Sequence, residues 1–104
     1  MKIKFYKPKN VNWRDELIAP ITARISGVLH RFNNQITRVE VHLSDDSGKI
    51  AGVNDKRCMI LVEVQGLQPI SITGHAGSYE NAVNDAILKL KMSLYATYGR
   101  LRVF

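Results

Sequence analysis

The sequence predicts an α+β fold, a two-layer sandwich with elements in the order β-α-β-β-β-α. Two observations support this order. First, apolar residues recur at spacings of three and four over residues 18–32 and 83–98, as on one face of a helix. Second, apolar and polar residues alternate in four other, short segments, as in a strand. An element that is apolar on one side must bury that side against another layer. We therefore expect both helices to cover one face of a four-stranded sheet and the other face to stay open to solvent.

The first strand and first helix are predicted from residues 2–32. Residues 2–6 alternate lysine with apolar side chains, as a half-buried strand does. The apolar stripe of the helix comprises Ile18, Ile21, Ile25, Val28, Leu29 and Phe32. Pro20 conflicts with this helix, because an interior proline loses a hydrogen bond and clashes with the preceding turn. Either the regular helix begins near Pro20 or it is kinked there, and we expect Asn33 and Asn34 to end it.

Three further strands are predicted over residues 37–44, 57–65 and 68–73. The first two are joined by a long hairpin loop at residues 45–55, and the last two by a tight turn at Gly66. The strand of residues 2–6 should run parallel to the next one, because a helix connects them by a right-handed crossover. The other strands should form an antiparallel meander. This is the architecture of double-stranded-RNA-binding domains with an extra leading strand.

The last helix is predicted to start after Gly77, with Ser78 as its N-cap, and to end at Gly99. The preceding segment GHAGS, residues 74–78, is interpreted as a strand-to-helix turn. The free amides of the helix N-terminus are an alternative site for a phosphate oxygen.

The chain of 104 residues is expected to form one domain over residues 1–104. Its apolar runs are too short to span a membrane, and its first ten residues lack the apolar run of a signal peptide, which predicts a cytoplasmic protein. The single Cys58 excludes an internal disulfide, and we expect it to be a small buried hydrophobe in a strand.

No residue pattern indicates catalysis or metal binding. The three histidines fall on three different elements without ligand spacing, and Asp45, Asp46 and Asp55 lack the alternate spacing of a calcium loop. No serine or cysteine lies in a nucleophile motif. We therefore predict that the protein is not an enzyme and has no cofactor, metal or small-molecule substrate.

Positive charge is concentrated in the first third of the chain. The net charge is +6, and residues 1–34 hold seven Lys/Arg against two Asp/Glu. Since the helices should lie side by side, basic residues on their outer surfaces should share one groove or ridge that contacts RNA phosphates. The ordinary alternative is that these side chains only solvate the helices. The candidates on or next to the two helices are Arg24, Arg31, Lys89, Lys91, Arg100 and Arg102.

The open sheet face is a second candidate surface. Met59 and Leu61 should be exposed there beside Arg38 and His42, and exposed apolar strand residues often mark a partner surface. This favours an alternative function, a protein-interaction module or weak homodimer of the same fold. Met59 and Leu61 are equally consistent with single exposed apolar residues that need no partner.

Several short segments occur in an order that is typical of one protein family. These segments are RF at 31–32, ITRVEVHLSD at 36–45, DKRC at 55–58, PI at 69–70, HA at 75–76, KLK at 89–91 and GRL at 99–101. Together they resemble the ribosome hibernation-promoting factors and ribosome-associated translation inhibitors, in particular their short, single-domain form.

The resemblance implies a β-α-β-β-β-α protein that binds small-subunit rRNA near the decoding centre and silences translation in stationary phase or stress. It implies that Lys89 and Lys91 face the ribosome, and it adds Lys56 and Arg57 of the DKRC segment as candidates. The chain departs from the family at Met92 and Ser93, where other members continue with lysine and arginine.

Overall fold

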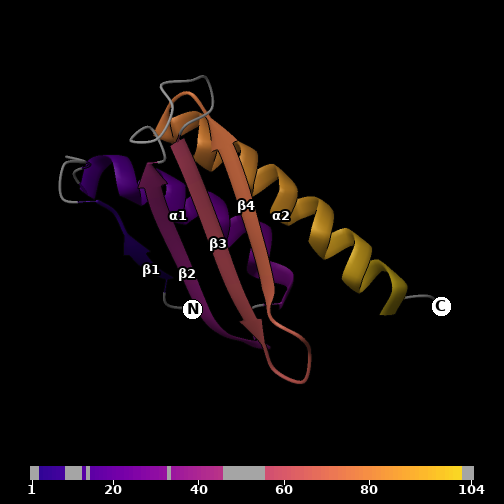
Figure 1. The fold of residues 1–104 in the computed structure, drawn as a ribbon. Coiled ribbons are helices and arrows are strands. Elements are labelled where there is room, and N and C mark those ends of the chain that lie inside the picture. The colour runs from indigo at the N-terminus through magenta and orange to yellow at the C-terminus, as the bar shows by residue number, and fades with distance from the viewer. Residues whose placement is uncertain (1–2, 9–12, 14, 33, 46–55, 102–104) are drawn as a thin grey trace.

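The computed structural model describes residues 3–8, 13, 15–32, 34–45 and 56–101, with only the backbone described for 15–17 and 97–101 (Figure 1). The predicted loop at 46–55, Asn33 and Arg102 therefore lie outside the described residues. The elements follow the predicted order. They are β1 (Ile3–Tyr6), α1 (Asp15–Leu29), the 3-10 turn η1 (His30–Phe32), β2 (Ile36–Asp45), β3 (Lys56–Val64), β4 (Ile70–Ala76) and α2 (Tyr79–Leu101).

The four strands form one mixed sheet in the order β1-β2-β3-β4. β1 runs parallel to β2, with Ile3 opposite Val39, and the remaining pairs are antiparallel, as predicted. Figure 1 shows both helices on the same side of the sheet. Since each helix follows a strand of the same direction, α1 and α2 run in the same direction across that face. The predicted α+β sandwich is confirmed.

The core lies between the sheet and the two helices. The sheet contributes the alternating residues of β2 and β3 on one side, and α1 and α2 contribute their predicted apolar stripes. Residues of these stripes that are fully or almost fully buried include Ile25, Leu29, Val39, Val41, Cys58, Ile60, Val62, Val83, Ala86 and Leu90. The apolar periodicity in the sequence therefore identified the core correctly.

The helix boundaries differ in part from the predicted ones. α1 begins at Asp15 and continues through Pro20, so the alternative in which the regular helix begins near Pro20 is wrong. α1 ends at Leu29 and η1 extends the helical segment to Phe32, directly before the predicted end at Asn33 and Asn34. α2 extends to Leu101 rather than ending at Gly99. None of the helices in the described part of the chain is long and apolar enough to cross a membrane.

Gly74 lies inside β4, not in a strand-to-helix turn. Its Cα faces α2, where an added Cβ would come within 2.5 Å of the Ala82 carbonyl oxygen and the Ala86 backbone nitrogen. Only a residue without a side chain permits this close approach of strand and helix. The turn itself is limited to Gly77 and Ser78, and the Ser78 hydroxyl accepts a hydrogen bond from the Asn81 amide at 3.2 Å, which confirms the predicted N-cap.

Candidate nucleic-acid interface

A groove of about 540 Å³ separates the outer surfaces of the two helices. α1 and η1 form one wall and α2 forms the other. The residues that line it are Arg24, Gly27, Val28, Arg31, Phe32, Asn84, Ile87, Leu88, Lys91, Leu94 and Tyr95. The expectation that the two helices share one groove is therefore met by the geometry.

All charged side chains that line the groove are cations. Arg24, Arg31 and Lys91 are exposed, and no aspartate or glutamate is among the lining residues. The Arg24 guanidinium donates a hydrogen bond to Asn84 Oδ1 and so links α1 to α2 across the groove. A lining with three cations and no carboxylate favours an anionic ligand.

The floor and rim of the groove are apolar. Ile87 and Leu94 are buried at its base, while Leu88 and Tyr95 are 57% and 70% exposed. Ile87 and Leu94 belong to the apolar stripe predicted for this helix, whereas Leu88 and Tyr95 were not predicted to be part of a site. The available signal was that Leu88 and Tyr95 fall outside the buried stripe of the helix, where a surface helix normally carries polar residues.

Lys89 does not line the groove, although it was predicted to contact RNA from the same surface as Lys91. Its Nζ lies 3.0 Å from Asp85 Oδ2 and donates to the Thr73 carbonyl oxygen at 3.3 Å. Asp85 also accepts a hydrogen bond from the His75 amide at 3.1 Å. Lys89 and Asp85 therefore form hydrogen bonds with the backbone of β4, which is an edge strand of the sheet. Because these backbone groups are already hydrogen-bonded, they are protected from pairing with a strand of another chain.

The DKRC cations do not line the groove. Lys56 forms an ion pair with Asp45 at 2.9 Å, and its Nζ lies 5.4 Å from the ring centre of Tyr79, the first residue of α2. At 1.5 Å per residue, Tyr79 is about 18 Å along the helix axis from Lys91. Arg57 is half-buried and pairs in register with Ser44 and His75.

Arg100 belongs to α2 rather than to a tail beyond it, because the helix continues to Leu101. The structure describes only its backbone, and Arg102 lies outside the described residues.

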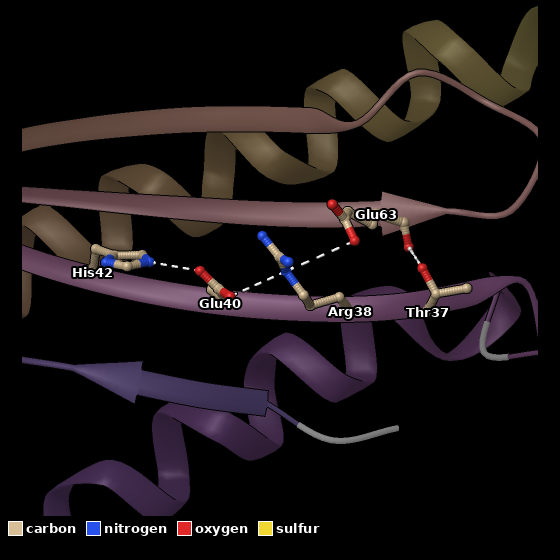
Figure 2. A network of polar contacts seen from close by, with 5 residues as sticks. All are labelled: Thr37, Arg38, Glu40, His42 and Glu63. Carbon is tan, nitrogen blue, oxygen red and sulfur yellow. Dashed lines mark hydrogen bonds and ion pairs between the residues drawn. The ribbon is translucent and has the colours of Figure 1, made fainter.

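The open sheet face carries a polar network that joins β2 to β3 (Figure 2). Arg38 Nε lies 3.0 Å from Glu40 Oε2 and 3.7 Å from Glu63 Oε2, and His42 Nε2 lies 2.8 Å from Glu40 Oε1. The Arg38 and His42 side chains are thus both engaged by Glu40. This arrangement makes Arg38 a weaker candidate for phosphate binding than the arginines of the groove.

Apolar and aromatic side chains flank this network. Met59 and Leu61 lie on the open face as predicted, but they are half-buried rather than fully exposed. Tyr6, which the sequence analysis did not consider, stacks on the His42 ring with centroids 4.4 Å apart and is 43% exposed. The parallel register of β1 and β2 places these two residues side by side, and that register cannot be deduced from composition.

Among the residues that the structure describes, two carboxylates have lowered pKa values. The hydrogen bond from His42, assisted by the charge of Arg38, holds the pKa of Glu40 below its ordinary value of 4.5. The hydrogen bonds from Lys89 and from the His75 amide hold the pKa of Asp85 below 3.8. Because the folded pKa values are depressed, both groups contribute stability above their unfolded pKa values, and this contribution is lost as pH falls through the folded values.

We expect the urea midpoint to fall between about pH 7 and about pH 3, and to fall less in the double variant Glu40→Gln and Asp85→Asn. Urea titrations of both proteins, followed by circular dichroism at the two pH values, measure the difference. An identical pH dependence in the variant would show that these carboxylates are not linked to folding. Glu80→Gln, at an exposed glutamate in the first turn of α2, is the matched control.

Cys58 is fully buried in β3, as expected, and burial raises the pKa of its thiol to about 12. Since the thiolate is the reactive form, we expect iodoacetamide at about pH 8 to leave the native protein unmodified and to alkylate Cys58 fully in urea. Mass spectrometry of the two samples measures this. Rapid alkylation of the native protein would mean that β3 opens readily.

No metal centre is formed among the residues that the structure describes, since no three of their His, Cys, Asp and Glu side chains cluster suitably.

Comparison with known proteins rests on structure alone, because no family model and no curated protein matches the sequence. A ribosomal subunit interface protein from Coxiella burnetii superimposes with a TM-score of 0.68 at 16% identity, over 95% of this chain and 99% of that one. The Protein Y N-terminal domain from Thermus thermophilus gives a TM-score of 0.70 at 18% identity, over 93% and 99%. Both are of the hibernation-promoting-factor type. The chain has the hibernation-factor fold. The similarity read from the sequence is therefore confirmed at the level of the fold.

Proposed function

We propose that the protein is a non-enzymatic, cytoplasmic, ribosome-associated factor that acts as a single domain. It binds small-subunit rRNA near the decoding region and represses translation under stress or in stationary phase. The observation that carries this proposal is the groove between α1 and α2, whose charged lining residues are all cations, on a fold shared with a protein described as a ribosomal subunit interface protein.

Arg24, Arg31 and Lys91 are the residues to which we assign phosphate binding. They lie on one surface, they are exposed, and no lining carboxylate neutralises them. Phosphate contacts supply affinity and orientation but little sequence information, so this surface suits a partner that is recognised mainly by shape and charge. Arg100 and Arg102 stay candidates for the same role; the structure describes only the backbone of Arg100, and Arg102 lies outside the described residues.

The other candidate cations receive lesser roles in this proposal. Lys89 is engaged with Asp85 and Thr73, so its release for RNA would cost those contacts. Lys56 lies beside Tyr79 at the start of α2, and Arg57 is the next residue of β3. Neither lines the groove, and they would contact separate phosphates if the RNA extends to the start of α2.

Sedimentation tests the proposal. Lysates of stationary-phase cells are separated on sucrose gradients at low and high salt, and the fractions are probed for this protein. We expect it in the small-subunit fractions at about 50 mM salt and largely released at about 200 mM, because counterion release makes phosphate binding steeply salt-dependent. Absence from ribosomal fractions at both salt concentrations would refute the proposal.

The alternative function is a homodimer or protein-interaction module that uses the open sheet face. The observation that favours it is the group of Tyr6, Met59 and Leu61 beside the Glu40 network, with Tyr6 43% exposed. Light scattering of the purified protein distinguishes the two: a dimer that dissociates on Met59→Asp, together with absence from ribosomes, would support the alternative.

A further inference from the structure

We propose that the groove between α1 and α2 receives an unpaired nucleotide, with its base against Tyr95 and its phosphates held by Arg31 and Lys91. This inference rests on the proposed function and deepens it, because it names single-stranded rather than duplex RNA as the ligand. It departs from the expectation that A-form RNA is read by shape alone.

The size and shape of the groove support a single inserted base. Its volume of about 540 Å³ is within the range of about 300–1,000 Å³ that is usual for small-ligand pockets. A duplex keeps its bases stacked inside and presents phosphates at its surface, so it would lie across the two helices without filling the space between them. The groove is therefore better suited to an unpaired base that is turned out of the base stack of the RNA.

The lining of the groove matches the two parts of a nucleotide. Ile87, Leu94 and the half-buried Phe32 provide an apolar floor, which suits a base and not a phosphate. Arg31 and Lys91 stand on opposite walls and suit the phosphates on either side of that base. A purely phosphate-binding surface would have no use for this apolar floor.

Tyr95 is the residue to which we assign base stacking. It lines the groove, it is 70% exposed, and its ring stacks on no other ring among the residues described. An exposed aromatic side chain beside cations is the usual platform for bases of single-stranded RNA. Leu88, about two turns earlier on the same wall and 57% exposed, extends the apolar edge of that platform.

Fluorescence anisotropy tests this assignment with an oligouridine of about eight nucleotides and an RNA duplex of the same length. We expect the wild-type protein to bind the single strand more tightly than the duplex. Tyr95→Ala should weaken single-strand binding about tenfold and leave duplex binding unchanged, since stacking on one side chain contributes on that order. Tyr95→Phe keeps the ring and should bind like the wild type.

The matched control is Met92→Ala, which removes another exposed apolar side chain of α2, 63% exposed, that does not line the groove. It should leave binding unchanged. Circular dichroism should show that all variants keep the wild-type helix content, because Tyr95 and Met92 both lie outside the core.

The outcomes separate this inference from the proposed function. The assignment of a base-binding pocket would be overturned if the protein binds the duplex tightly, or if Tyr95→Ala and the wild type bind the single strand equally well. If the protein nevertheless cosediments with small subunits, the proposed function would still hold. Failure to bind either RNA, together with absence from subunits, would overturn both and reassign the groove to a protein partner.

Discussion

Replacing Arg24, Arg31 and Lys91 together by glutamine is expected to lower affinity for the small ribosomal subunit by roughly a thousandfold or more. Hydrogen bonds to charged groups contribute about 1.5–3 kcal/mol each, and about 1.4 kcal/mol corresponds to a factor of ten. The triple variant should also reduce the slope of log affinity against log salt concentration by about two to three. Filter binding of purified subunits over a range of salt concentrations measures both quantities.

The matched control removes three cations that lie away from the groove. Lys4, Lys7 and Arg38 are exposed residues of β1, of the segment after it and of β2, and their replacement by glutamine changes the net charge by the same amount. This control should lose much less affinity, because only long-range attraction is weakened. Equal losses in the two triple variants would mean that general charge, rather than the groove, drives binding.

Gly74→Ala is expected to destabilise the fold by about 2–3 kcal/mol, the cost of forcing extra atoms into a packed core. The added Cβ would meet backbone atoms of Ala82 and Ala86, which cannot turn away as a flexible side chain can. α2 would have to move off β4. Since domains of this size have about 5–15 kcal/mol of stability, the change should be clear in a urea titration.

Gly77→Ala is the control for this substitution. Gly77 lies three residues further on, and an added Cβ there has no atom within 4 Å. It should change stability by less than about 0.5 kcal/mol. A Gly74→Ala variant that is as stable as Gly77→Ala would show that strand and helix are not as tightly packed as the structure indicates.

The fold could be predicted because the spacing of apolar residues, three to four in a helix and two in a strand, shows which side chains are buried. Val39, Val41 and Leu43 alternate with polar residues, and the structure buries all three. The extension of β4 could not be predicted in the same way. Gly74 has low strand propensity. The close packing of α2 on Gly74 and the hydrogen bond from the His75 amide to Asp85 hold this segment in the strand, and both contacts form only in the folded protein.

The candidate site was predictable only in part. Sequence reasoning placed Arg24, Arg31 and Lys91 on helices that share a sheet face, but it could not distinguish Lys91 from Lys89. These two lysines are two residues apart on α2, about 200° around the axis, so one lines the groove and the other reaches β4. The apolar floor and Tyr95 were missed because the width of the groove depends on how far the two helices diverge.

Photo-crosslinking from the groove is the most direct test of the central claim, that this surface contacts small-subunit rRNA. A cysteine introduced at Leu88 in the groove, or at Ser71 on the open sheet face, carries the crosslinker, since the buried Cys58 should not react. We predict crosslinks to small-subunit rRNA from position 88 and none from position 71. Crosslinks from position 71 alone would contradict the account and place the ribosome contact on the sheet.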